Sequence, residues 1–172
     1  DILAKNALKL LNHNLAKVLK NGADLEARQN MLVGSMLAGQ AFANAPVGAV
    51  HALAYPLGGH FHLSHGHSNA LVLVEVLKFN APKAKQYYAE LMQLLDPRST
   101  GCTDGLCDLF IDHMQNHLDQ SGLTLKLKNL DIPEAKLPQL AKDALLQTRL
   151  LQNNPRELTE QDALQIYQVI YA

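Results

Sequence analysis

The sequence has no tryptophan, only two cysteines and few charged residues. Cys102 and Cys107 stand five positions apart, which fits neither a disulfide framework nor a CxxC metal pair, so we expect a reducing, cytoplasmic setting. Charged residues make up 18% of the 172 positions, and the formal net charge is -1. Because the lysines and arginines are spread along the chain and form no basic face, we expect no nucleic-acid partner.

Charge is absent altogether from one long stretch, since no Asp, Glu, Lys or Arg occurs between Met31 and Val74. A membrane-spanning helix needs about 20 mostly apolar residues without strong breakers. Here prolines, glycines and histidines interrupt the run. We therefore expect no membrane span and interpret the stretch as the buried centre of a soluble domain.

What the chain does have is apolar residues, 48% of the total, which is enough for one sizeable core. They recur at spacings of three and four, as in the series Ala4, Leu8, Leu11, Leu15 and Leu19. This spacing is typical of amphipathic helices, and no convincing strand pattern occurs. We predict an all-α, multi-helix bundle that forms a single domain over residues 1–172.

The helix boundaries follow from capping and breaking residues. We expect the first helix to stop at a left-handed Gly22, and a second, central helix to follow an Asp24 cap. The remaining expected helices are 47–55, 67–80, 81–95, 103–122, 132–155 and 159–171, and we expect a break in the chain at 56–59. Thr103 or Asp104 is the expected cap of helix 103–122, and Thr159 that of helix 159–171. There is no GxGxxG or GxxxxGK[ST] motif, so no nucleotide site is visible.

Five of the eight histidines lie within residues 51–67. Neutral imidazole is a good ligand for borderline ions such as Zn²⁺ and Fe²⁺, which need about four donors. His51 and Tyr55 are one helical turn apart and share a face. The predicted break lets the chain reverse, so that His65 can point back at His51 and form part of a metal site.

The other histidines of this stretch have simpler explanations. We expect His60, His62 and His67 to line the mouth of a pocket or to face solvent. A histidine on an apolar face can also be an ordinary core residue, and a purely structural helical domain would need no metal. Both explanations stay open from the residues alone.

The segment "LAGQAFANAPVGAVHALAYPLGGHFHLSHGHSNALVL" strongly resembles the metal-binding segment of the iron-containing (group III) alcohol dehydrogenases. That family's pattern runs AF-x-NA, G-x-x-HA, LGG and HG-x-x-NA. The similarity extends from the opening "ILAKNALKLLNHNLAKVLKNGADLEARQNMLVGSMLAG" to the closing "NNPRELTEQDALQIYQVIY". The resemblance implies a dehydroquinate synthase-like helical C-terminal domain, and an N-terminal NAD(P)-binding domain that is absent from this chain.

The resemblance also implies a metal site and a reaction. Family members bind Fe²⁺ or Zn²⁺ with one Asp and three His. The last two of these histidines match His51 and His65 by their fourteen-residue separation. By this resemblance, the Asp and the first His are expected to precede this chain. The ion polarises an alcohol, aldehyde or ketone for hydride transfer with NAD(P). We expect this chain alone, as half of the site, to be inactive, and the full protein to be an oxidoreductase, with a homodimer as a common family state.

Three further residues take roles from the resemblance. Phe42 matches the aromatic of AF-x-NA and would be a wall of the substrate pocket, although ordinary core packing explains it equally well, and His60 lies near the same pocket. Tyr55 stands where most family dehydrogenases have a second histidine. A phenol donates a hydrogen bond but shuttles protons poorly at neutral pH, so the substitution leaves the substrate class open.

The main alternative is a stand-alone helical metal-binding or interaction module without catalysis. Its support is "DHMQNH", in which His113 and His117 lie at i and i+4 and could bind zinc on one helix face, with Asp112 or Asp119 nearby. No HExxH glutamate accompanies them. A solvated helix face explains these residues equally well.

Overall fold

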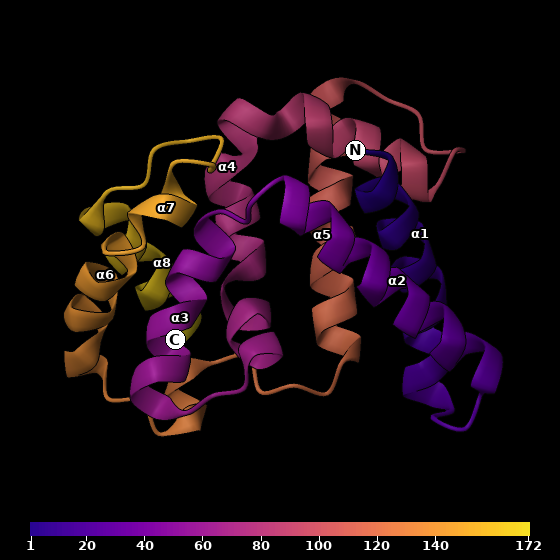
Figure 1. Ribbon diagram of the computed structural model, residues 1–172. Helices are drawn as coiled ribbons and strands as arrows, with labels where there is room; N and C mark the ends of the chain where they lie inside the picture. Colours follow the sequence, from indigo (N-terminus) through magenta and orange to yellow (C-terminus); the bar gives the residue numbers. More distant parts are fainter. The chain divides into compact units, whose positions relative to one another are not determined.

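The computed structural model describes residues 1–172 as helices joined by short loops (Figure 1). No strand forms, so the predicted all-α class is confirmed. The α-helices are α1 (Ile2–Lys20), α2 (Leu25–Asn44), α3 (Ala49–Phe61), α4 (His65–Leu95), α5 (Thr103–Gln120), α6 (Leu137–Leu145), α7 (Thr148–Leu151) and α8 (Glu160–Tyr171). Two 3₁₀ turns, η1 (Leu127–Leu130) and η2 (Glu134–Lys136), precede α6.

The chain forms two compact units. The first contains Asp1–Pro46 and Lys85–Ser121, and the second contains Val47–Ala84 and Gly122–Ala172. Helix α4 contributes its first part to the second unit and its last part to the first. The division falls just after Pro82, which lies inside α4 and cannot donate the backbone hydrogen bond expected at that position.

In the first unit, α1 and α2 lie side by side as a helical hairpin (Figure 1). Gly34 is the point of closest approach, because a Cβ atom there would lie 2.9 Å from Cγ of Leu11. Asn14 is buried in this hairpin, where its Nδ2 donates to the Leu10 carbonyl at 2.8 Å and its Oδ1 accepts from Asn30 at 3.5 Å. A polar residue is therefore hydrogen-bonded where α1 packs on α2.

The last part of α4 packs on α5 in the same unit. The rings of Tyr88 and Phe110 have centroids 5.4 Å apart, and Lys85 forms an exposed 2.7 Å ion pair with Asp104. Cys107 is buried here and Cys102 is exposed, both as free thiols. Burial raises the pKa of the Cys107 thiol, with the charges of nearby aspartates as a further cause, which favours the unreactive protonated form.

The second unit holds the larger apolar cluster, formed by α3, the first part of α4, and the segments from η1 to α8. Tyr167 of α8 is fully buried, and its hydroxyl donates a 2.6 Å hydrogen bond to the backbone carbonyl of Leu53. Burial, and secondarily the charge of Asp143, raise the pKa of this phenol, so it stays a hydrogen-bond donor. This bond ties α8 to the middle of α3.

The start of α3 is fixed by Asn154. Its Oδ1 accepts from the backbone N–H of Ala49 at 3.3 Å and from Nδ2 of the buried Asn80 at 3.0 Å. Its Nδ2 donates to Oδ1 of Asn80 at 2.7 Å and to the Arg156 carbonyl at 2.6 Å. Because Gly48 has no side chain, Asn154 can approach the helix start closely. One amide therefore replaces a helix cap and satisfies a buried partner.

The predicted break at 56–59 is wrong. Helix α3 continues through Pro56 and ends at His62, which adopts the left-handed conformation with φ of 56°. A proline inside a helix costs about 3 kcal/mol. Here Leu53 and Leu57 are both fully buried, so the apolar face of α3 packs into the core on either side of Pro56 and outweighs that cost.

Several other boundaries need correction. Gly22 is not left-handed, since α1 ends at Asn21 in an extended conformation. The predicted helices 67–80 and 81–95 form one helix, α4, and 132–155 divides into η2, α6 and α7. The N-cap of α5 is Cys102 rather than Thr103 or Asp104. The Asp24 and Thr159 caps are confirmed, each by a side-chain bond to a backbone N–H.

The predicted central position of α2 is also wrong within this chain. Only Ala27 and Gly34 of that helix are buried, whereas Leu32 is 73% exposed and Met36 is 52% exposed. Its apolar residues occur on more than one face, so hydrophobicity alone could not tell a buried helix from an uncovered one. None of the helices combines the length and the apolar character that crossing a bilayer requires.

Candidate functional site

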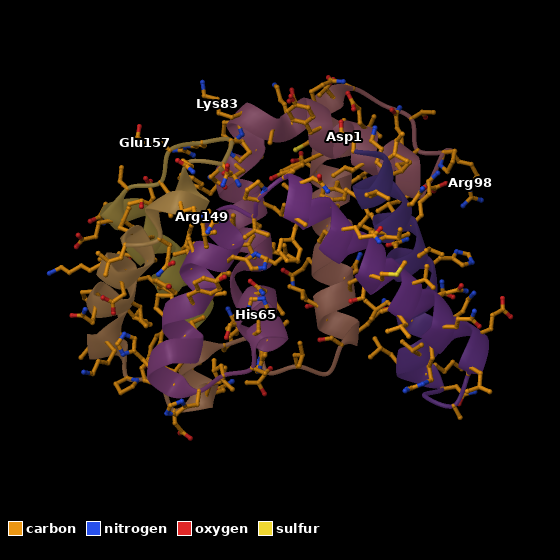
Figure 2. The ribbon with its side chains drawn as sticks, in the orientation of Figure 1. Asp1, His65, Lys83, Arg98, Arg149 and Glu157 are labelled. Atoms are coloured by element: carbon orange, nitrogen blue, oxygen red, sulfur yellow. The ribbon has the colours of Figure 1, made fainter.

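Three rings of the second unit converge where α3 meets the start of α4. The centroids of His51 and His65 are 5.1 Å apart, and the Tyr55 ring lies 6.4 Å from His51 and 6.2 Å from His65. His51 and Tyr55 are on successive turns of α3. His65, labelled in Figure 2, is the first residue of α4. The short connection through His62 turns the chain and brings His65 beside His51.

The surroundings of His51 favour its neutral imidazole form. Burial, and secondarily the facing charge of a protonated His65, lower the pKa of His51. His51 is half-buried, while His65 and Tyr55 are exposed. Since metal ions bind the unprotonated ring nitrogen, this shift favours the charge state in which His51 can act as a ligand.

Asn69, one turn after His65 on α4, adds a polar group to the cluster. Its Nδ2 lies 3.0 Å from Nε2 of His65, so in this amide orientation Nδ2 donates a hydrogen bond to the unprotonated Nε2. The other amide atom, Oδ1 of Asn69, is buried and has no hydrogen-bond partner. A buried oxygen without a hydrogen-bond partner fits a site that is completed by a further group.

The donor set is incomplete as a metal shell. No group of three or more His, Cys, Asp or Glu side chains is placed to hold an ion. His51 and His65 supply two imidazoles, whereas borderline divalent ions in proteins need about four donors. The residues present therefore fit half of a metal site.

The other three histidines of the segment have partners of their own. His60 is exposed, and its Nε2 lies 2.6 Å from a carboxylate oxygen of Asp143 on α6. His67 lies 2.6 Å from the Thr124 carbonyl through Nε2. His62 is the exposed left-handed residue that ends α3. None of the three is among the ring contacts of His51.

Phe42 belongs to the first unit, not to the unit that holds His51. Its side chain is 58% exposed and lines an apolar groove between α1 and α2, together with Leu8, Leu11 and Ala38. The alternative of ordinary core packing for Phe42 is wrong, because a core residue would be buried. Its role in the substrate pocket stays a prediction.

A second histidine pair lies on α5 in the first unit. Nε2 of His113 and Nε2 of His117 lie 2.5 Å and 2.7 Å from the same atom, Oδ1 of Asn12 on α1. Their ring centroids are 4.6 Å apart and nearly perpendicular. Burial, and secondarily the charge of a protonated His113, lower the pKa of His117. The predicted aspartate partners, Asp112 and Asp119, take no part in these contacts; Asp119 instead accepts from Gln115.

Sequence reasoning missed three residues of these clusters. Asn69 was visible as the asparagine of the HG-x-x-NA pattern, but no role was assigned to it. Asn12 carried no local signal, because its partners His113 and His117 lie 101 and 105 residues away. Asp143 carried none either, because its partner His60 lies 83 residues away. Contacts at such separations follow from helix packing and not from spacing.

Comparison with known proteins places the chain in one family. The profile described as "Fe-containing alcohol dehydrogenase family, C-terminal" matches residues 1–171. The chain is 38% identical over 173 residues to long-chain-alcohol dehydrogenase 1 of Geobacillus thermodenitrificans, which covers all of this chain and 44% of the relative. It is 33% identical over 168 residues to 1,3-propanediol dehydrogenase of Klebsiella pneumoniae, covering 97% of this chain and 43% of the relative.

The fold comparison agrees. A crystal structure of 1,3-propanediol oxidoreductase superposes with a TM-score of 0.94 at 31% identity, covering 99% of this chain and 45% of that one. The chain thus spans less than half the length of the relatives it matches. The helical architecture, the segment from Phe42 to Asn69 and the similarity over the full chain all agree, so this protein belongs to the iron-containing alcohol dehydrogenase family and corresponds to its C-terminal domain.

Proposed function

We propose that residues 1–172 act as one domain, the metal- and substrate-binding half of an NAD(P)-dependent alcohol dehydrogenase. The observation that carries the proposal is the convergence of His51, Tyr55 and His65 in a chain of this family. The proposed substrate is a small-molecule alcohol, or in the reverse direction an aldehyde or ketone. The proposed setting is cytoplasmic and homodimeric.

His51 and His65 would hold the metal, Fe²⁺ or Zn²⁺, together with donors outside residues 1–172. When bound, the ion is a Lewis acid that lowers the pKa of an alcohol hydroxyl and polarises a carbonyl. Imidazole ligands are neutral, so two of them would leave the dipositive charge of the ion largely uncompensated. In the absence of metal, Asn69 orients the His65 ring by a hydrogen bond to its Nε2.

Tyr55 would contact the substrate oxygen. Its phenol is 43% exposed and lies beside both imidazoles, so it can donate one hydrogen bond to an alcohol or carbonyl oxygen held there. This bond orients the substrate and excludes water from one side of the reacting centre. Phe42 and His60 are proposed to border the substrate pocket.

The nicotinamide cofactor would be bound mainly by an N-terminal domain outside residues 1–172. No phosphate-binding glycine motif occurs in residues 1–172. We therefore expect the isolated chain to show no alcohol-dependent reduction of NAD(P)⁺. Turnover by the isolated chain would contradict the proposal.

Metal analysis of the full-length protein tests the assignment. Purified His51→Gln and His65→Gln variants should each lose one equivalent of bound Fe²⁺ or Zn²⁺ per chain, together with activity. His62→Gln is the matched control, because this exposed histidine lies in the connection between α3 and α4 and outside the ring cluster. Full metal content in His51→Gln would contradict the proposal, as would metal loss that occurred only in His113→Gln or His117→Gln.

A further inference from the structure

We propose that His113 and His117 of α5, with Asn12 of α1, form a second binding site for a borderline divalent ion of the zinc class. The site lies within the first unit and shares no residue with the His51 cluster. It does not depend on the proposed dehydrogenase function, since it requires only the packing of α1 against α5.

The geometry converges on one point. Two imidazole nitrogens from successive turns of α5 lie 2.5 Å and 2.7 Å from a single oxygen, Oδ1 of Asn12. Histidines at i and i+4 project from the same helix face, which is the spacing with which one helix supplies two ligands to zinc. The nearly perpendicular rings, with centroids 4.6 Å apart, allow both nitrogens to face the same position.

Without metal, each Nε2 carries its proton and donates to the Asn12 oxygen, which accepts two bonds. Binding an ion requires the proton of each neutral imidazole to move to Nδ1, so the lone pair of Nε2 is freed and no net charge changes. The Asn12 oxygen is then the third donor, and water completes the shell.

The required movement is small. Two ligands bound to zinc at about 2.0–2.1 Å with tetrahedral angles lie about 3.3 Å from each other. The present nitrogen–oxygen separations are shorter by less than 1 Å. Asn12 can supply this space by a side-chain rotation, because it is only partly buried and borders a surface hollow that His13 and Asn30 also line. Ions can reach the Asn12 oxygen from this hollow.

The test uses the 172-residue chain with the double substitution His51→Gln and His65→Gln, which removes the other imidazole pair. Isothermal titration with zinc chloride should give one bound Zn²⁺ per chain. Adding His113→Gln or His117→Gln should raise the dissociation constant for zinc at least tenfold. Adding Asn12→Ala should raise it at least threefold. Glutamine keeps an N–H that can still donate to Asn12, so helix packing is retained, as circular dichroism would verify.

His13→Gln is the matched control, since this exposed histidine neighbours Asn12 but makes no contact with the α5 pair. It should leave zinc affinity unchanged. A second measurement uses the unsubstituted chain: zinc should shift the imidazole ¹⁵N resonances of His113 and His117 together. Absence of zinc binding in the double variant, or binding that survives His117→Gln, would overturn the site. Unchanged affinity in Asn12→Ala would overturn the third ligand.

Discussion

The hydroxyl of Tyr167 donates to the carbonyl of Leu53, two residues after His51. This 2.6 Å bond joins α8, at the end of the chain, to the helix that carries two rings of the candidate site. Leu53 is fully buried, so the bond forms away from water. The position of His51 therefore depends on packing that involves the last helix of the chain.

Replacing Tyr167 with Phe should lower the free energy of unfolding by about 0.5–1.5 kcal/mol, because one buried hydrogen bond is lost while the ring still fills its place. Urea unfolding followed by circular dichroism measures this difference. Tyr87→Phe is the matched control, since Tyr87 is 66% exposed and should tolerate the change. Equal stability of the two variants would show that the Tyr167 bond contributes nothing.

Removing the Asn154 amide should lower the free energy of unfolding by more than the loss of the Tyr167 hydroxyl does. Asn154→Ala removes the acceptor for Ala49 and leaves the amide of Asn80, which is 5% exposed, without its reciprocal partner. An unsatisfied buried polar group costs about 1–3 kcal/mol. Hydrogen exchange of the α3 amides should accelerate accordingly. Asn153→Ala is the control, because that side chain is exposed and bonds mainly within its own turn; comparable acceleration there would contradict the assigned role.

Two glycines of α2 offer a matched comparison for the hairpin. Gly34→Ala would place a methyl group 2.9 Å from Leu11 and should destabilise the first unit. Gly39 has no heavy atom within 4 Å of its added Cβ. Gly39→Ala should therefore stabilise α2 by up to about 1 kcal/mol through helix propensity. The midpoint of thermal unfolding should fall in Gly34→Ala and rise in Gly39→Ala. A higher midpoint for Gly34→Ala would contradict the close approach of α1 and α2.

The parts of the fold that the sequence predicts are those that local chemistry determines. The Asp24 and Thr159 caps bond to N–H groups three residues away, so their signals lie within one turn. Pro56 misled the boundary prediction because its local cost is offset by burial in a core that distant segments build. Hydrophobic spacing likewise predicted α1 but could not show that α2 stays largely uncovered.

The candidate site divides in the same way. The pairing of His51 with His65 needs only a chain reversal between neighbouring helices, and family patterns pointed to both residues. The contact between Asn12 and His117 needs α1 and α5 to pack, and nothing in either segment indicates the other. Long-range polar contacts of this kind are visible only in the folded chain.

The capping box of α8, formed by Thr159 and Asp162, should make the stability of the chain depend on pH. Burial raises the pKa of Asp162, but two hydrogen bonds from Thr159 and the charge of Arg156 outweigh it, so the pKa lies below its ordinary value of 3.8. A lowered carboxyl pKa contributes stability that is present above the ordinary value and is lost as pH falls through the folded value. Thermal unfolding midpoints between pH 5 and pH 2 should fall less in Asp162→Asn than in the unsubstituted chain. Identical pH profiles would contradict this contribution.

Tyr55 allows the convergence of the rings to be tested without any enzymatic assay. Tyr55→His would place a third imidazole on the same face as His51, one helical turn away, and beside His65. Three imidazoles bind zinc more tightly than two, because each further nitrogen replaces a water ligand with one held in place by the fold. In a chain that carries His113→Gln and His117→Gln, zinc affinity measured by titration should rise at least tenfold.

The matched control for this gain is Tyr87→His, which adds an exposed histidine to α4 in the first unit. It should leave zinc affinity unchanged, as should Tyr55→Phe, which removes only the hydroxyl. If the added imidazole at position 55 gave no more affinity than the one at position 87, the three side chains would not share a common point. His51 and His65 could then be close in space without being arranged to hold one ion.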